Sequence, residues 1–478
     1  MPERELSILY GDDTLQAKLP ERTRVIKQTK KPLPALKDPA QAVRDALDSP
    51  IAHDPLPKLV NSKSKVTIAF DDPIGFFTPQ KPTDFREVAI KVLLEELDKL
   101  GVDSKRVQLV CAIGLHRKWT HTELASILGE DLVYKSSVSR LYNFDAEDRE
   151  NLVFLGETDR GHEVEVSRVV TESDQLIYVS NPWSQFNGGW KSVTVGLSSW
   201  RSIRHNHRPF VKSSGKSQLD PKRSAFPKLL NEVGAVIEKE LAKKGRRVLL
   251  VQGTQNNADP RELAQVVAGH PPEIQVRGLE ILDDQLVVDV KGQSDVVIYG
   301  MNNRMDPYSR MSVINPIGVR NYAMSYRYGL FQNIPLVKPG GILIFCHPCR
   351  NQFDAVRYPS YVEMFEKLLP QNQDALELWD LYAEEYANRP EFIHKYRYGY
   401  AFHGVHPLIL YGQGIYGLRY AGKAFLAGAT DFEAARRVGF EPFASVEEAV
   451  AEAENLMGKG CSISYLDMPQ SFVCNVVE

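Results

Sequence analysis

Apolar residues recur in two patterns that alternate along the first part of the chain. Short, almost continuous apolar runs at residues 65–70 and 106–114 are typical of strands buried on both faces. Each run is followed by residues with helical spacing of apolar positions, at 83–101 and 120–131, and a Thr or Asp stands ready to cap each helix. Strands that alternate with helices form parallel sheets, so the pattern predicts an α/β fold.

The alternation continues towards the C-terminus. Further strands are expected in apolar runs at residues 162–170, 174–180, 246–253, 295–300, 340–345, 406–412 and 462–467. Further helices are expected where apolar residues return every three or four positions, at residues 38–50, 228–245, 359–369 and 445–458. An alternating stretch at residues 6–21 predicts an opening hairpin.

The length of the chain favours two domains. A chain of 478 residues is too long for one ordinary hydrophobic core. We place the boundary near residue 275, because the polar stretch at residues 269–278 resembles a linker. This division predicts an N-terminal α/β domain at residues 1–275 and a C-terminal α/β domain at residues 276–478, each with a mainly parallel sheet. We expect an active-site cleft between them.

Composition narrows the class of protein. With 58 Lys and Arg against 61 Asp and Glu, the net charge is -3, so we expect neither nucleic acid nor a membrane as a partner. No run approaches the roughly 18 apolar residues of a membrane span, and the first residues lack the apolar core of a leader peptide. We therefore expect a cytoplasmic protein. The five cysteines have no framework spacing, which favours free thiols.

Polar residues follow several of the predicted strands. Asp71 and Asp72 end one strand, His116 lies in the loop after the next, and a Gly-Gly-Trp-Lys turn at residues 188–191 follows a third. Any one of these is more typical of a turn or a loop histidine. Because ligands bind at the carboxyl ends of parallel strands, three such loops in one domain predict a cleft.

Three other motifs point to less specific chemistry. The GGWKS sequence at residues 188–192 lacks the glycine spacing of a phosphate-binding loop, so hydrolysis of a nucleoside triphosphate is not expected. Cys346 and Cys349 have the spacing of a redox dithiol, but a poor helix start follows, so we expect thiols without a catalytic role. His403 and His406 lack the glutamate of a zinc-binding helix and are expected to be packing or surface histidines.

Four segments together resemble the nickel-dependent lactate racemase family. They are KVTIAFDDP at residues 65–73, CAIGLHRKWTHTELASILGED at 111–131, NLVFLGETDRGHEVEVSRVVTESDQLIYVSN at 151–181 and FNGGWKSVTVGL at 186–197. The order and spacing of all four make the resemblance specific. It extends from the LYGDD sequence at residues 9–13 to about residue 210, and more thinly to LVKPGGILIF at residues 336–345.

The resemblance implies a two-domain enzyme with a nickel-pincer nucleotide, a pyridinium mononucleotide that holds nickel through two sulfur groups. It implies that Lys191 carries this cofactor covalently, that His207, sixteen residues further on, ligates the nickel, and that His116 is an acid/base. Further cofactor-binding residues are expected at Asp71, Asp72, Gly188 and Gly189. The implied partners are a small 2-hydroxy acid and the proteins that make the cofactor.

The chain departs from the family pattern where the substrate is expected to bind. Asn181 stands where the family has a second catalytic histidine, and an amide cannot act as a base. The PIGFFTP segment after Asp72 has no arginine for the substrate carboxylate, and Arg304, Tyr308 and Arg310 are candidates to replace it. We therefore predict an isomerase, a racemase or epimerase of a 2-hydroxy acid other than lactate. The alternative is a cofactor-binding relative with one-face redox chemistry or a non-catalytic binding role.

Overall fold

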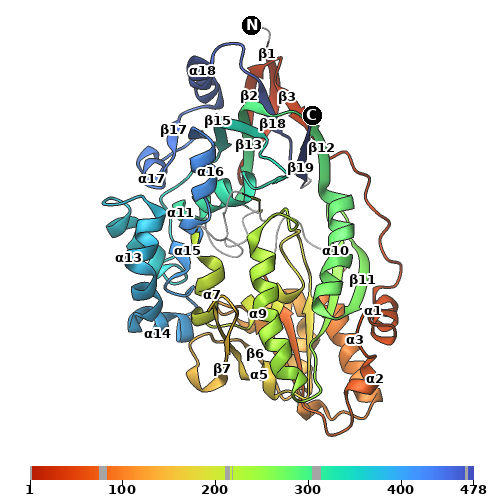
Figure 1. Cartoon of the computed structure of the whole chain (residues 1–478). Helices are drawn as coiled ribbons and strands as arrows, with labels where there is room; N and C mark the ends of the chain where they lie inside the picture. The colour runs from red at the N-terminus through yellow and green to blue at the C-terminus, as the bar shows by residue number, and fades with distance from the viewer. Residues whose placement is uncertain (1–2, 75–82, 210–215, 218, 304–313, 469–471) are drawn as a thin grey trace.

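The computed structural model describes residues 3–74, 83–209, 216–217, 219–303, 314–468 and 472–478. These residues form two α/β units, each built round a sheet with mainly parallel strands, as the sequence predicts. In Figure 1 the first unit lies below the second, and both ends of the chain lie on the upper unit.

The first unit contains a six-stranded sheet. Its strands are, in spatial order, β11 (Leu263–Gly269), β10 (Leu249–Gln255), β9 (Gln175–Ser180), β4 (Val66–Asp71), β5 (Val107–Ala112) and β6 (Arg140–Asn143). All neighbouring pairs are parallel except β10 and β11, which are antiparallel. β7 (Leu152–Glu157) and β8 (Glu163–Ser167) form a separate antiparallel pair.

Helix caps fix where the chain turns back after each strand of this unit. Asp84 accepts a hydrogen bond from the backbone at the start of α3 (Phe85–Lys99). Thr120 and Glu123 form a complete capping box at the start of α4 (His121–Leu128). The strand and helix positions in this region follow the sequence prediction closely, because the apolar periodicity and the caps agree.

The second unit contains an eight-stranded sheet that includes the N-terminal strands of the chain. Its strands are β17 (Glu441–Phe443), β16 (Lys423–Ala427), β15 (Val337–Cys346), β13 (Ser294–Asn302), β1 (Glu3–Gly11), β2 (Asp13–Pro20), β18 (Ile463–Leu466) and β3 (Arg24–Ile26). The predicted hairpin is β1 and β2, and β1 also pairs with β13 at Tyr10 and Gly11. The N-terminal strands therefore precede residue 275 in sequence but lie in the second sheet in space. The boundary itself stays a prediction.

Two expectations about individual segments are wrong. Residues 406–412, expected as a strand, are helix α15 (His406–Gly412), in which all seven residues are buried. A continuous apolar run is equally compatible with a buried strand and a buried helix, so periodicity could not separate them. The linker-like residues 269–278 begin helix α10 (Pro271–Leu286), whose prolines lie in the first turn, where no backbone donor is needed.

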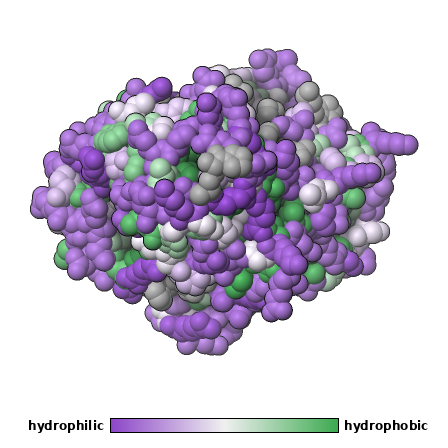
Figure 2. All heavy atoms as spheres, turned by 90° about the horizontal axis from the view of Figure 1, so that it is seen from above, coloured by the Kyte–Doolittle hydropathy of each residue, from purple (hydrophilic) through white to green (hydrophobic). Residues whose placement is uncertain are grey.

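The hydrophobic core runs through both units. One continuous cluster of buried residues includes Ile68 of β4, Tyr299 of β13 and Leu426 of β16. A smaller cluster, with Ile8 and Val450 among its members, lies between the opening hairpin and α18 (Val446–Met457). Hydrophilic residues cover most of the face in Figure 2, and the apolar ones form small separate groups. Among the described residues, no helix is both long and apolar enough to cross a bilayer.

Close packing between β10 and α3 leads to a first prediction. A Cβ added to Gly253 would lie 2.4 Å from the ring of Phe85, with no room to move within the core. We expect Gly253→Ala to reduce the free energy of unfolding by about 1–3 kcal/mol, as overpacking does. Urea denaturation measures this change. Gly460→Ala is the matched control, since nothing lies within 4 Å of its added Cβ. Equal stability of the two variants would contradict the packing described here.

Candidate active site

The strand order of the first sheet brings the ends of four strands into one row. β10, β9, β4 and β5 are parallel neighbours, so their carboxyl ends lie at the same edge. Gln255 ends β10, Asn181 follows β9, Asp71 ends β4, and the loop that carries His116 follows β5. The loops expected to form a site therefore meet at one edge of the sheet.

The carboxylate of Asp71 holds the loop that follows β9. It accepts hydrogen bonds from the Tyr178 hydroxyl at 3.0 Å, the Ser180 hydroxyl at 3.1 Å and the Asn181 backbone N–H at 2.8 Å. Three donors from one neighbouring strand fix the carboxylate and the start of this loop together. Asp71 therefore acts on the loop, and its oxygens are already occupied by protein donors.

Asp72 faces the opposite neighbour and holds the imidazole of His116. The Nδ1 of His116 lies 2.9 Å from one carboxylate oxygen of Asp72, and the indole N–H of Trp119 lies 3.4 Å from the same oxygen. Asp72 is buried, whereas the side chain of His116 retains 27% of its exposure. Because a carboxylate accepts hydrogen bonds, it favours the ring form with hydrogen on Nδ1.

Two glycines place Lys191 at the start of helix α6 (Trp190–Gly196). Gly188 and Gly189 have φ angles of 81° and 57°, and a Cβ at these positions would lie 2.5 Å and 2.6 Å from the side-chain oxygens of Gln252 and Gln275. The turn therefore requires glycine on two independent grounds, backbone conformation and space.

The amine of Lys191 has an unusual environment. Nζ lies 5.3 Å from the centre of the Phe186 ring. Burial of the ammonium lowers the pKa of Lys191, and the negative charges of Asp71 and Asp72 oppose this shift only in part. A lysine with a lowered pKa carries more neutral amine at a given pH, which is the nucleophilic form.

The HNH sequence near the end of helix α7 (Trp200–His207) presents its two histidines to different surroundings. His207 is buried, packs edge-to-face on Phe226 at 5.8 Å, and pairs through Nδ1 with the side-chain oxygen of Asn206. His205 lies 3.3 Å from Glu163 and stacks on His162. Only His207 of the two lies in the interior, against helix α9 (Ala225–Ala242).

A residue of the second unit completes the surroundings of His116. The ring of His406, the first residue of α15, is 5.4 Å from the ring of His116, with the planes at 87°. Phe402 stacks on His406 at 4.7 Å, and the hydroxyl of Tyr361 hydrogen-bonds its Nδ1. No local motif marks this position, because the two histidines are 290 residues apart in the chain.

Residues 10–219 match the lactate racemase N-terminal domain. The chain therefore contains a lactate racemase N-terminal domain. A lactate racemase from Lactiplantibacillus plantarum is 30% identical over 182 residues, which are 37% of this chain and 40% of that protein. A lactate racemase from Thermoanaerobacterium thermosaccharolyticum is 25% identical over 268 residues, which are 54% of this chain and 56% of that protein. The chain thus spans about half the length of these relatives, or less.

Solved structures show the same architecture over nearly the whole chain. The lactate racemase apoprotein from Thermoanaerobacterium thermosaccharolyticum has a TM-score of 0.70 at 18% identity and covers 98% of this chain and 100% of its own. A protein from Thermotoga maritima has a TM-score of 0.56 at 12% identity, covering 94% of this chain and 100% of its own. At these identities the likeness concerns the fold alone.

The residues round Lys191 fit the cofactor that the family resemblance implies. The side-chain oxygens of Gln185 and Gln252 are buried beside the glycine turn and have no hydrogen-bond partner among the described residues. Within the described part of the chain, no three His, Cys, Asp or Glu side chains gather to hold a metal ion. A desolvated amine, one buried imidazole and unpaired amide acceptors suit an organic group that carries a metal.

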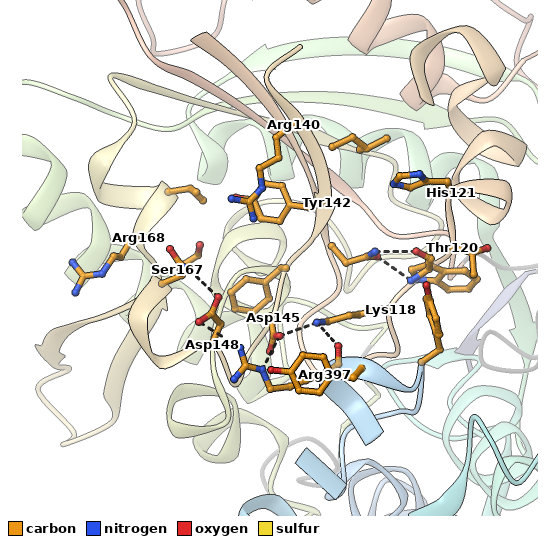
Figure 3. Close-up of a pocket in the computed structure, with 18 residues that line it drawn as sticks. Lys118, Thr120, His121, Arg140, Tyr142, Asp145, Asp148, Ser167, Arg168 and Arg397 are labelled. Atoms are coloured by element: carbon orange, nitrogen blue, oxygen red, sulfur yellow. Dashed lines mark hydrogen bonds and ion pairs between the residues drawn. The ribbon is translucent and has the colours of Figure 1, made fainter. Parts of the chain in front are cut away.

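Ion pairs of the two residues after His116 fix the loop that carries it. Arg117 is buried and donates to both oxygens of Glu123, at 3.0 Å and 2.7 Å. Lys118 and Arg397 both donate to Asp145, at 2.8 Å and 3.1 Å. Figure 3 shows the contacts of Lys118 and Arg397 with Asp145 at the wall of a cavity of about 680 Å³ beside β6. Among its described lining residues none is a predicted site residue, so this cavity lies outside the site.

The remaining predicted residues do not enlarge this site. All five cysteines are free and buried, and burial raises the pKa of the Cys346 and Cys349 thiols, which disfavours the reactive thiolate. The substrate candidates Arg304, Tyr308 and Arg310 lie outside the described residues.

The lowered pKa of Lys191 has a consequence for stability. The folded protein binds fewer protons at Lys191 than the unfolded chain does at pH values between the two pKa values, so the cost of the buried charge is largest below the folded-state pKa. We expect Lys191→Met to be more stable than the parent protein at pH 7. The difference should shrink as the pH rises towards the ordinary lysine pKa of about 10.4.

Urea denaturation at pH 7, 8.5 and 10 tests this expectation. Lys459→Met removes an exposed lysine and controls for the loss of one positive charge. A Lys191→Met difference that stays constant over these pH values, or that favours the parent protein at pH 7, would contradict a desolvated amine.

Proposed function

We propose that this protein is a racemase or epimerase of a 2-hydroxy acid, and that it uses a nickel-pincer nucleotide held by Lys191 and His207. One observation carries the proposal: a carboxylate-held imidazole, His116, lies at the same sheet edge as a desolvated lysine amine. The two curated relatives are lactate racemases, which supports the isomerase class.

His116 handles the proton of the substrate hydroxyl in this proposal. Asp72 fixes the orientation of the ring, so the imidazole can take the hydroxyl proton and return it. The side chain of His116 is partly exposed, so a small molecule can reach it, whereas Asp72 is buried beneath it.

Lys191 and His207 would hold the cofactor. The amine of Lys191 would supply the permanent attachment, and the neutral amine favoured by desolvation is the form that can react. The Nδ1 of His207 faces Asn206, so Nε2 would be the nitrogen that ligates nickel. When bound, the group supplies an acceptor for hydride from C2 of the hydroxy acid. The cell must also provide the proteins that make the cofactor.

The side chain of Asn181 favours the alternative function. Asn181 lies at the same edge as His116, but its side-chain oxygen accepts a hydrogen bond from Gln255 at 3.4 Å, and an amide has no basic nitrogen. With a single acid/base, the protein would oxidise one stereoisomer or bind it without inverting it. Racemisation therefore depends on a second proton-handling residue.

Separate roles for Lys191 and His207 make a distinct prediction. In protein from a cell able to make the cofactor, we expect Lys191→Ala to lose the added mass on the peptide that contains residue 191. We expect His207→Ala to keep that mass and to bind nickel at least about tenfold more weakly, because one ligand is lost. Intact mass, peptide mass and nickel content measure these effects.

His205→Ala is the matched control for the nickel measurement. His205 lies two residues before His207 on the same helix but pairs with Glu163 at the surface side. We expect it to keep both the mass and the nickel. Equal nickel loss in the two histidine variants would remove His207 from the proposal.

The absence of an arginine from the segment after Asp72 predicts the substrate range. An arginine that binds a carboxylate contributes about 1.5–3 kcal/mol, which corresponds to roughly tenfold to a hundredfold in kcat/KM. We therefore expect lactate to be at least about tenfold poorer than the best substrate in a panel of larger 2-hydroxy acids. Chiral chromatography of each product measures the rates. Lactate as the best substrate of the panel would show that another cation performs this role.

A further inference from the structure

The cavity beside β6 is lined by residues of both units. Its walls come from the loop after His116, from β6 and the residues that follow it, and from the end of α14 (Pro390–Tyr398) in the second unit. Its volume of about 680 Å³ lies within the range of small-molecule sites, roughly 300–1,000 Å³. Because none of its described lining residues belongs to the predicted racemase site, a molecule bound here would be separate from the substrate.

Arg140, the first residue of β6, presents a positive charge to this cavity. Its guanidinium carbon lies 3.5 Å from the centre of the Tyr142 ring, and Figure 3 shows the guanidinium over that ring. Arg140 is exposed, and among the described residues it forms neither a hydrogen bond nor an ion pair. An arginine that stacks on an aromatic ring keeps its N–H groups in the plane of the guanidinium, where a carboxylate or phosphate can accept two of them.

The other charged side chains that line the cavity are already compensated. Lys118 and Arg397 pair with Asp145 at 2.8 Å and 3.1 Å, and Arg397 also lies 3.5 Å from Asp148. Arg168 pairs with a glutamate four residues further along the chain, at 3.1 Å. The two cations and two carboxylates of the first group cancel, so the positive charge at the start of β6 is the one that would attract an anion.

Aromatic rings and hydroxyls without partners line the same cavity. Tyr142 is partly buried, and Tyr398 and Tyr400 are exposed. Burial raises the pKa of Tyr142, so its hydroxyl keeps its proton, and this hydroxyl has no hydrogen-bond partner in the described part of the chain. Ser167 is buried, and its hydroxyl likewise has no partner among the residues that the structure describes. Such a lining suits a ligand that combines an aromatic ring with polar groups.

The wall of the cavity is connected to the carboxylate that holds His116. The side chain of Asn143 accepts a hydrogen bond from the backbone N–H of Trp119 at 3.0 Å and donates one to its carbonyl at 2.9 Å. The indole of the same tryptophan donates to Asp72 at 3.4 Å. Asn143 and Trp119 both line the cavity, so a bound molecule would contact the residues that link the cavity to Asp72.

We propose that this cavity is an effector site for a small planar aromatic anion, a molecule with one aromatic ring system and a carboxylate or phosphate group. Arg140 binds the anionic group, and the ring lies against the tyrosines of the cavity. The bound molecule acts on His116 through Trp119 and Asp72. This site does not depend on the proposed racemase function.

Calorimetry on protein without cofactor tests the ligand class with four probes. Adenosine monophosphate and 2-naphthoate each combine a ring with an anion and distinguish a phosphate from a carboxylate ligand. Adenosine supplies the ring alone, and inorganic phosphate supplies the charge alone. We expect one of the two aromatic anions to bind at least about tenfold more tightly than adenosine and phosphate, because it makes both kinds of contact. Equal binding of phosphate, or no binding of either aromatic anion, would overturn the ligand class.

Variants of the lining residues test where the anion binds. We expect Arg140→Ala to weaken binding of the tighter probe at least about tenfold, because a charge-assisted pair is lost, and Tyr400→Ala to weaken it at least about threefold. Both side chains are exposed, so the fold should not change. Arg419→Ala is the matched control, since Arg419 on α16 (Ile415–Tyr420) is also exposed and has no ion pair among the described residues. Equal affinity of the two arginine variants would remove Arg140 from the site.

Histidine signals in NMR locate the bound molecule and test its effect on His116. His121 lines the cavity, whereas His53 does not. In histidine-labelled protein without cofactor, we expect the tighter probe to shift the signals of His121 and His116 and to leave that of His53 in place. An unchanged His121 signal would show that the probe binds elsewhere, and an unchanged His116 signal would refute the effector role. Because no catalysis is measured, neither result depends on the proposed function.

Discussion

Two consecutive carboxylates at the end of the central strand β4 organise the site. Asp71 ends β4 and Asp72 follows it, and the two side chains reach different neighbours. Asp71 binds three donors of the β9 side, and Asp72 binds His116 on the β5 side. The loop with Asn181 and the loop with His116 are thereby fixed with respect to one strand. A change at either carboxylate would release one side of the site.

The second unit contacts the loop that carries His116 directly. Hydrogen bonds from the segment before α15 reach the backbone of the His116 loop, and His406 follows directly on that segment. The opening hairpin belongs to the same unit, although it comes first in the chain. The opening hairpin and β18 thus lie in one sheet of the second unit, although they come from opposite parts of the chain.

The glycine turn shows how backbone constraints and chemistry coincide. Gly188 and Gly189 are needed for their positive φ angles and because glutamine side chains occupy the space of a Cβ. The same turn starts the helix that positions Lys191. Burial of the amine lowers the pKa of this lysine.

Local sequence predicted the helices and strands correctly where apolar periodicity and capping residues agree, and incorrectly where they do not. The strands and helices from residue 65 to 131 follow from clean apolar periods, from Asp84 and from the capping box at Thr120. The helix at His406 was expected as a strand, because a continuous apolar run shows neither the period of a helix nor that of a strand. The helix at residues 271–286 was expected in part as a linker, because proline is compatible with both.

The sequence by itself determined the α/β class, the family and the loops that carry Asp72, His116 and Lys191, because these depend on neighbouring residues and on the order of motifs. Tertiary structure decided which of two adjacent carboxylates holds His116, since that depends on which strand lies on each side of β4. It also decided that His207 of the HNH sequence faces the interior. The meeting of His116 with His406 depends on the packing of two units across 290 residues of chain, which no local pattern encodes.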